Sequence, residues 1–159
     1  MKQFTDKEGR KWEITLTIGA AKRVRDLLEV NLLEPEAGNP PLLTRLTTDE
    51  IFLCDVLYCL CMAQATDRGV TDVDFGELLC GDVVLAAHEA LYGELLDFFQ
   101  KRGRTDRATA IRKQLSVFRM SVAKAEVEIG KLDLEAEVEN AFGKPSISSP
   151  ALPESTPTP

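Results

Sequence analysis

The residue best suited to acid–base chemistry is His88, the only histidine in the chain. A catalytic histidine acts together with an orienting carboxylate and a nucleophile. Glu89 follows it directly, but neighbouring residues of a helix point to different faces. We therefore expect His88 to be a boundary residue of a helix, and no other set of residues in the sequence predicts an enzyme.

The candidate metal ligands are four cysteines: Cys54, Cys59, Cys61 and Cys80. Zinc-binding cysteines are usually paired at Cys-x-x-Cys spacing or have histidines nearby. Here Cys54 and Cys61 share one face of a predicted helix, whereas Cys59 points well away from it. We expect free cysteines that pack as small hydrophobic residues, and neither a metal nor another cofactor.

Carboxylates near two glycines could bind calcium. An EF-hand loop needs oxygen ligands at its first, third and fifth positions and a glycine at the sixth. A loop that starts at Asp67 or at Asp72 does not satisfy this pattern. We interpret the acidic cluster as charges near helix N-termini, which the helix dipole favours; its members are Asp67, Asp72, Asp74 and Glu77. Asp55 lies alone in an apolar segment, where a solvated seam or a polar partner would satisfy it.

The charge of the chain is unevenly distributed. Its 159 residues have a formal net charge of −7, which argues against nucleic-acid binding because phosphate contacts need clustered Lys and Arg. Residues 49–100 contain eleven acidic residues and one basic residue, whereas residues 101–119 contain seven basic residues and one acidic residue. These segments form either two solvated surfaces that face each other or a basic docking face for an acidic partner. The candidate docking face is Arg102, Arg104, Arg107, Arg112 and Lys113.

The sequence indicates a protein of the cytoplasm. Residues 1–6 lack the apolar core of a secretory signal. The longest apolar segment, residues 51–63, is shorter than the roughly eighteen residues of a membrane span, and it contains Asp55. We therefore expect no membrane association, and the length suits one domain with a tail.

The hydrophobic pattern predicts an α+β fold, mainly α, in which an N-terminal β-hairpin packs on a bundle of about four helices. The turn Asp6–Gly9 joins a short strand around Phe4 to a longer one. Two strands alone are marginally stable in water, so the hairpin must lie on helices. Alternating apolar residues define the inner face of the longer strand: Trp12, Ile14, Leu16 and Ile18.

Helices are expected at residues 19–30, about 51–65, about 72–79, 82–99 and about 105–140. Asn31 is expected to end the first helix in a left-handed conformation. Thr47 and Glu50 have the spacing of a capping box, which predicts where the second helix begins. That helix is apolar nearly all round, as a central core helix is. The domain covers residues 1–142, and residues 143–159, rich in Pro, Ser and Thr, are predicted to be disordered.

A heptad-like seam follows the last helix, and Leu132 and Ala136 extend it. Its apolar residues recur at spacings of three and four: Ala108, Ile111, Leu115, Phe118, Val122, Ala125 and Ile129. The seam packs either against the chain's own helices or against a partner. The candidate residues for a homo-oligomer are Ala108, Ile111, Leu115, Phe118 and Val122.

Five leucines lie around a loop that Pro, Gly and Asn predict between the first two helices. Such apolar positions are poorly sheltered. They either cap the core or form an apolar groove for an amphipathic helix of a partner. These candidate partner-binding residues are Leu32, Leu33, Leu42, Leu43 and Leu46.

From Phe4 to about Phe99 the chain resembles the small tail assembly chaperones of tailed phages and prophages. The matching segments are Phe-Thr-Asp-x-x-Gly-Arg-x-Trp from Phe4, Lys22–Arg25, Leu53–Tyr58, Arg68–Asp72 and Asp97–Phe99. These segments are structural rather than catalytic.

The resemblance implies a small, non-enzymatic protein of the bacterial cytoplasm that binds the long, aggregation-prone tape measure protein during tail assembly. In many such systems a translational frameshift appends a second domain, so a longer form of the chain itself is a further expected partner. The alternative function is a structural neck or head–tail connector component of the virion, which would form rings through the seam.

Overall fold

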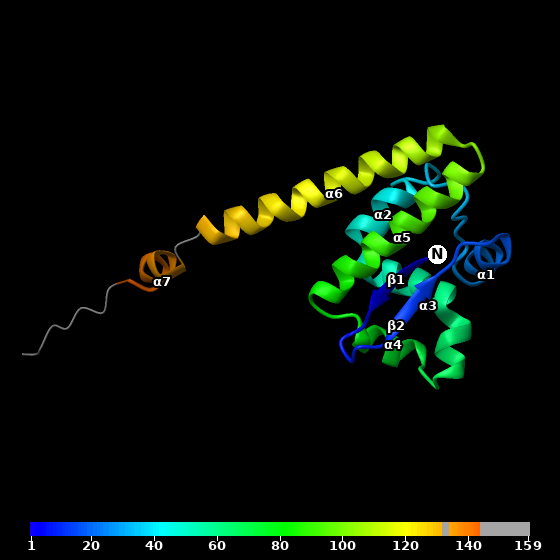
Figure 1. Ribbon diagram of the computed structural model, residues 1–159. Helices are drawn as coiled ribbons and strands as arrows, with labels where there is room; N and C mark the ends of the chain where they lie inside the picture. Colours follow the sequence, from blue (N-terminus) through cyan, green and yellow to red (C-terminus); the bar gives the residue numbers. More distant parts are fainter. Residues whose placement is uncertain (132–133, 144–159) are drawn as a thin grey trace, which may run out of the picture. The chain divides into compact units, whose positions relative to one another are not determined.

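The computed structural model describes residues 1–131 and 134–143 (Figure 1). In these residues the strands β1 Lys2–Thr5 and β2 Lys11–Ile14 form an antiparallel hairpin. The predicted α+β, mainly α fold is confirmed. The helices that the structure describes are α1 Ile18–Leu28, α2 Leu42–Thr48, α3 Glu50–Asp67, α4 Asp72–Leu78, α5 Asp82–Lys101, α6 Thr105–Lys131 and α7 Leu134–Phe142.

The chain divides into two compact units, Met1–Ser121 and Val122–Pro159. The first unit contains the buried core. In the second unit the exposed large apolar side chains include Val127, Ile129, Val138 and Phe142. The helix expected at about 105–140 corresponds to α6 and α7, with residues 132 and 133, including Leu132 of the seam, outside the described residues. The predicted disorder of the tail likewise concerns residues 144–159, which the structure does not describe.

The hairpin places one face of each strand in the core. Phe4 pairs with Trp12 across the two strands, and both side chains are buried together with Ile14. Strand β2 ends at Ile14. The predicted alternation of inward-facing apolar side chains fails at its last residue, Ile18. Ile18 is 52% exposed because it begins α1 directly after the N-cap residue Thr17.

A buried carboxylate organises the turn of the hairpin. The Asp6 side chain accepts hydrogen bonds from the Trp12 indole Nε1 at 2.8 Å, from the backbone N–H of Glu8 and Arg10, and from Arg10 Nε at 3.1 Å. Burial alone would raise the pKa of Asp6, but these hydrogen bonds outweigh it and lower the pKa below its usual value. Gly9 completes the turn at φ 82°, a conformation that favours glycine.

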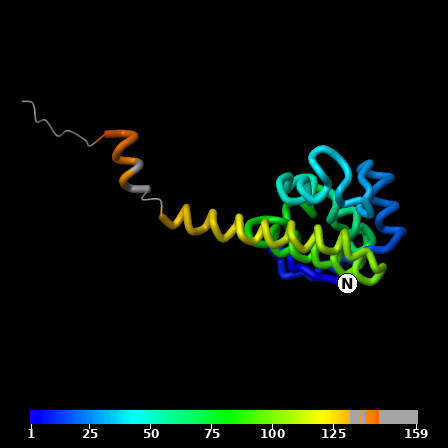
Figure 2. Tube along the Cα trace, turned by 90° about the horizontal axis from the view of Figure 1, so that it is seen from above, coloured from blue at the N-terminus to red at the C-terminus, as the bar shows by residue number. Residues whose placement is uncertain are grey.

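Helix α3 is the central helix, as its apolar sequence predicts. It contacts α1, α2, α4, α5 and β2, and its buried side chains include Leu53, Val56, Leu57 and Leu60. Helix α5 lies beside β1. In Figure 2 the hairpin lies along one edge of the first unit, away from the cyan segment that precedes α3. No helix among the described residues is long and apolar enough to cross a membrane.

Two predicted helix ends are wrong. Thr47 does not begin the second long helix, because it lies inside α2; instead Asp49 caps α3, its side chain accepting from the Phe52 N–H at 2.9 Å. The left-handed residue after α1 is Glu29, at φ 57°, and not Asn31.

The seam of α6 packs within the first unit over its first three positions. Ala108, Ile111 and Leu115 are buried, and the Phe118 ring lies 3.9 Å from the His88 ring of α5. For that part of the seam, this confirms the interpretation that it packs against the chain's own helices. The buried positions are not available as a face for self-association, whereas Ile129 is 63% exposed.

Replacing Asp6 with Asn is expected to destabilise the protein by about 1–3 kcal/mol at pH 7, because buried donors lose a charged acceptor. The pKa of Asp6 is lower in the folded state, so its stabilisation is present above about pH 4, the usual pKa of Asp. It is lost as the pH falls through the folded pKa. Urea unfolding followed by the fluorescence of Trp12, the single tryptophan, measures both effects.

The matched control is Asp26→Asn, because the Asp26 side chain is 55% exposed and its partner Arg25 lies 3.4 Å away at the surface. We expect this variant to match the wild type within experimental error. Equal stability of Asp6→Asn and the wild type at pH 7 would show that the carboxylate does not organise the hairpin.

Candidate functional site

A groove lies where α3, α4 and the start of α5 meet, and it has a volume of about 360 Å³. We call it the acidic groove. Its apolar lining is formed mainly by Ile51, Leu53, Leu57, Val73, Leu79 and Val84. Its acidic lining residues are Glu50, Asp55, Asp72 and Glu77, and no Lys, Arg or His lines it among the described residues.

Local sequence signals position α4 at this groove. Thr71 and Asp74 form a capping box, in which Thr71 Oγ1 accepts from the Asp74 N–H and Asp74 Oδ2 accepts from the Thr71 N–H, both at 3.2 Å. Phe75 then anchors α4 in the core, its ring 4.9 Å from Trp12 and 5.5 Å from Tyr58. The anchored helix leaves Asp72 and Val73 on the groove side.

Two side chains at the edge of the groove are unusually exposed for apolar residues. Ile51 of α3 is 79% exposed and Val73 of α4 is 74% exposed. Covering either side chain with another surface removes apolar area from water. This lowers the free energy by about 25 cal/mol per Å² of apolar area buried. The groove is therefore suited to contact with another apolar surface.

The electrostatics of the groove favour a positively charged partner. Burial, followed by the negative charges of Asp72 and Asp49, raises the pKa of Asp55 above its usual value. Burial, followed by the charges of Asp55 and Asp72, raises the pKa of the Cys54 thiol to about 11. A cation in the groove would relieve the repulsion between these carboxylates.

The leucines predicted to form a partner-binding groove lie elsewhere. Leu32, Leu42, Leu43 and Leu46 are buried in the core, so the expectation that they are poorly sheltered is wrong for these four. The sequence did not indicate α2, which begins after Pro41 without a side-chain cap and turns all three of its leucines inward. Leu33 is half-buried.

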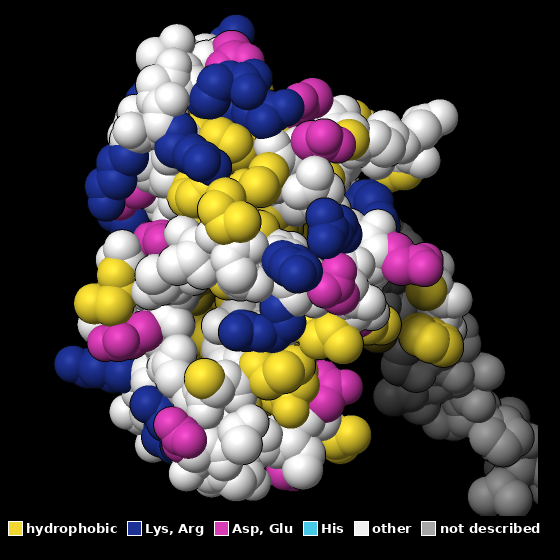
Figure 3. All heavy atoms as spheres, turned by 90° about the vertical axis from the view of Figure 1, so that its right-hand side faces the viewer, with side chains coloured by type: hydrophobic (Ala, Val, Ile, Leu, Met, Phe, Trp, Pro, Cys, Tyr) yellow, Lys and Arg dark blue, Asp and Glu magenta, His cyan; other side chains and the backbone are white. Residues whose placement is uncertain are grey.

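Leu33 lines a smaller hollow of about 160 Å³ beside α1, together with Ile18, Ala21, Lys22, Arg25 and Asn31. On the face that carries α1, hydrophobic side chains lie between Lys and Arg side chains (Figure 3). This hollow is the opposite of the acidic groove in charge, and it has less than half of its volume.

The five residues of the predicted basic docking face have different environments in the structure. Arg107 is used internally, because its guanidinium binds Glu36 at 2.6 Å and donates to the Leu33 carbonyl oxygen at 2.5 Å. Arg104 pairs with Asp106 at 2.7 Å, and Arg102 lies over the Phe98 ring at 5.0 Å. The other two members, Arg112 and Lys113, are exposed on α6.

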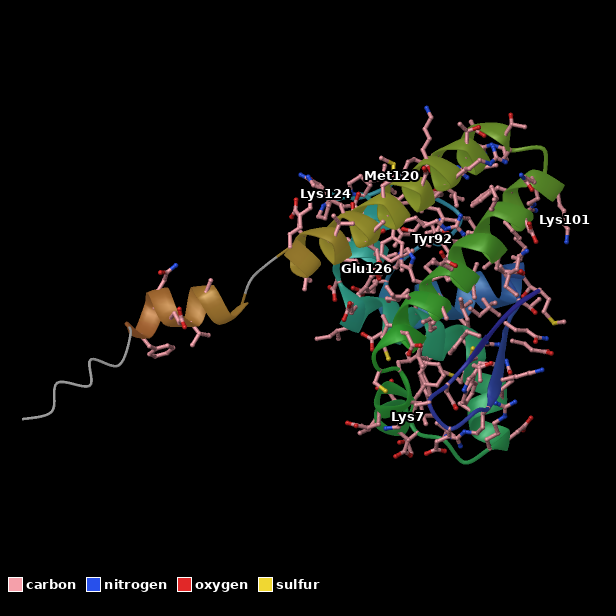
Figure 4. The ribbon with its side chains drawn as sticks, turned by 60° about the vertical axis from the view of Figure 1, so that its left-hand side comes forward. Lys7, Tyr92, Lys101, Met120, Lys124 and Glu126 are labelled. Carbon is pink, nitrogen blue, oxygen red and sulfur yellow. The ribbon has the colours of Figure 1, made fainter. Side chains whose placement is uncertain are left out.

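His88 is buried, and its predicted boundary position is wrong. Its ring stacks on Tyr92 at 4.3 Å and lies 3.9 Å from the Phe118 ring of α6. Tyr92 lies between α5 and α6 in Figure 4, and its hydroxyl is 2.9 Å from Thr47 Oγ1. His88 Nδ1 has no hydrogen-bond partner within the described part of the chain. Burial lowers the pKa of His88 to about 4, although the nearby charge of Glu89 acts in the opposite direction.

The cysteines are free. Cys59 and Cys61 are buried, Cys54 is half-buried at the acidic groove, and Cys80 is exposed just after Leu79. In residues 1–131 and 134–143 no group of three or more His, Cys, Asp or Glu side chains could hold a metal ion. Asp72 and Asp74 lie in the first turn of α4, as their interpretation as helix N-terminal charges predicts. The same interpretation is wrong for Asp67, which is the last residue of α3, and for Glu77, which lies near the C-terminal end of α4.

The burial of His88 predicts a loss of stability in acid. Its folded pKa of about 4 is below the unfolded value of about 6.5, so the unfolded chain binds the proton more readily. Stability is fully present above about pH 6.5 and falls as the pH drops toward 4. His88→Phe keeps an aromatic ring but removes the group that takes up a proton on unfolding. Urea titrations from pH 7 to pH 4 should show a smaller decrease for the variant, and equal decreases would contradict the prediction.

The chain matches no family model, no curated protein and no solved structure. Its functional site is therefore inferred from its own geometry, in which the acidic groove combines apolar lining, exposed apolar edges and unbalanced negative charge.

Proposed function

We propose that the protein is a non-enzymatic tail assembly chaperone that holds an amphipathic helix of the phage tape measure protein in the acidic groove. The observation that carries the groove as binding site is the exposure of Ile51 and Val73 beside four carboxylates, with no Lys, Arg or His among the described residues of the lining. The identity of the client rests on the resemblance of residues 4–99 to tail assembly chaperones. The proposed place of action is the bacterial cytoplasm, where the tail assembles.

An amphipathic helix suits the size of the groove. A helix with its side chains is about 10–12 Å wide, so about 360 Å³ accommodates apolar side chains from one face rather than the whole helix. Recognition of this kind uses anchors three or four residues apart. The client helix would lie across the groove and insert those anchors between α3 and α4.

The carboxylates select among amphipathic helices. Lys or Arg side chains that flank the apolar anchors would approach Glu50, Asp55, Asp72 and Glu77, whereas acidic flanks would be repelled. Attraction of this kind speeds association and weakens with added salt, because exposed charges are screened over about 8 Å at physiological ionic strength. The expected client segment is therefore apolar on one face and basic at its flanks.

Co-expression with a tape measure protein tests this function. We expect the wild type to raise the soluble fraction of the client, and Ile51→Asp and Val73→Asp to lose most of that effect. Both side chains are mostly exposed, so the substitutions should leave the fold intact. Substitutions at Leu42 or Leu46 are unsuitable, because a charge at these buried positions would unfold the domain.

Leu27→Asp is the matched control, since Leu27 is an apolar residue of α1 that is 55% exposed and does not line the acidic groove. It should hold the client like the wild type, and circular dichroism should show native helix content for all three variants. Client solubility that is indifferent to the wild-type protein would exclude the chaperone. A fixed copy number in purified virions would then favour the neck or head–tail connector.

A further inference from the structure

Helices α3 and α4, which flank the acidic groove, begin with the same six-residue pattern. We call these segments the two hexads, and they are Glu50–Asp55 of α3 and Asp72–Glu77 of α4. In both hexads the first and sixth residues are acidic, the second is β-branched and apolar, and the fifth is small. These four positions of each hexad line the groove: Glu50, Ile51, Cys54 and Asp55 from α3, and Asp72, Val73, Gly76 and Glu77 from α4.

The pattern gives the groove an apolar rim and a floor of small residues. Ile51 and Val73, the second residues of the hexads, are the exposed side chains of the rim. The fifth residues, Cys54 and Gly76, are half-buried, and we call them the floor pair. A Cβ atom added to Gly76 would meet Cys54 Sγ at 3.9 Å, so the two residues face each other. The acidic first and sixth residues are about 7.5 Å apart along each helix axis, and they flank the floor pair on both walls.

The fold of α4 does not require a glycine at its fifth residue. Glycine is less favourable than alanine within a helix, because it loses more conformational freedom on folding. Gly76 does not have the positive φ at which glycine is needed. An added Cβ would meet Cys54 Sγ at an ordinary van der Waals distance, so alanine would fit the free protein and strengthen the helix. A helical glycine without a backbone or packing reason indicates that something else needs the space.

We propose that the floor pair receives one large apolar side chain of the client helix, and that Gly76 sets the size of this anchor. Ile51 and Val73 of the rim would cover its sides. Lys or Arg residues about one turn before and after the anchor share its helix face, and they would reach the acidic ends of the hexads. This inference rests on the proposed function, because it uses the same groove, and it specifies the client segment more closely.

The proposal requires stability and binding to respond in opposite directions to one methyl group. Gly76→Ala removes the conformational cost of the glycine, so the free protein should melt about 1–4 °C higher. The same methyl group would occupy space that the anchor fills in the complex. Packed contacts do not accept an extra methyl group without displacing their neighbours, so a large anchor should bind more weakly.

Two labelled helical peptides of about 18 residues, long enough to form a helix, test this with the full-length protein. Both carry lysines one turn before and after a central anchor, which is Leu in one peptide and Ala in the other. In fluorescence anisotropy we expect the wild type to bind the Leu peptide more tightly than the Ala peptide. Gly76→Ala should weaken binding of the Leu peptide about fivefold or more and leave binding of the Ala peptide unchanged, which is the coupling expected for two groups in contact.

Gly19→Ala is the matched control. Gly19 is an exposed residue of α1 that does not line the groove, and an added Cβ would meet Thr17 Oγ1 at 3.7 Å. This variant should bind both peptides like the wild type. A Gly76→Ala protein that melts below the wild type would show that the fold itself needs the glycine. That result, unchanged binding of the Leu peptide by Gly76→Ala, or a wild type that binds both peptides equally would each overturn the proposal.

Co-expression with the tape measure protein keeps the two proposals distinguishable. If the wild type and Gly76→Ala hold the client equally well, the anchor site is excluded and the chaperone function stands. If the peptides bind as expected but no tape measure protein is held, the anchor site stands and the chaperone function is excluded.

Discussion

The rest of the first unit depends on how the buried Asp6 carboxylate is satisfied. Its hydrogen bond from the Trp12 indole fixes the ring that packs edge-on against Phe75 of α4. Arg68, at the end of α3, also holds this ring. Its guanidinium lies over the Trp12 ring at 4.5 Å and donates a hydrogen bond to the Lys11 carbonyl oxygen. A single acceptor in the turn thereby couples the hairpin to α3 and α4, two of the helices that form the acidic groove.

A second buried carboxylate fixes the exit from the hairpin. Glu94 of α5 accepts from the Leu16 N–H at 2.8 Å, and its other oxygen lies 2.9 Å from the Met1 ammonium group. Leu16 lies between β2 and α1, where no ladder or helix hydrogen bond is available to its backbone. Buried acids therefore act here as acceptors for isolated donors, whereas the acids around the groove lie beside one another without a Lys, Arg or His in the lining that the structure describes.

Local patterns were sufficient for the elements that depend on neighbours in sequence. The helix predicted at about 72–79 is α4, whose start the Thr71–Asp74 capping box fixes, and the apolar run through Leu57 predicted the central helix α3. Features that depend on distant segments were missed. His88 is buried because Phe118 of α6 covers it, a contact across thirty positions of the sequence that no periodicity reports.

The groove itself illustrates the same limit. Asp72 and Glu77 were interpreted as helix N-terminal charges and Asp55 as an isolated acid of an apolar segment, because a one-dimensional pattern does not show that Asp55 of α3 and Asp72 of α4 line one hollow. The prediction that the leucines around α2 are poorly sheltered was wrong because their helix was not recognised. Seven residues after Pro41 are too few to show a clear helical period, yet the structure folds them into a helix that buries Leu42, Leu43 and Leu46.

Burial, together with the acidity of the groove, determines which cysteine of the protein reacts. The thiolate is the reactive form of cysteine, and the pKa of Cys54 is raised to about 11 by burial and by the carboxylates beside it. Cys54 is therefore protonated at neutral pH, and burial protects Cys59 and Cys61 as well. Cys80 is the exposed thiol, one residue beyond the Leu79 lining of the groove. The fold thus provides a natural attachment point for a probe at the edge of the acidic groove, without any engineered residue.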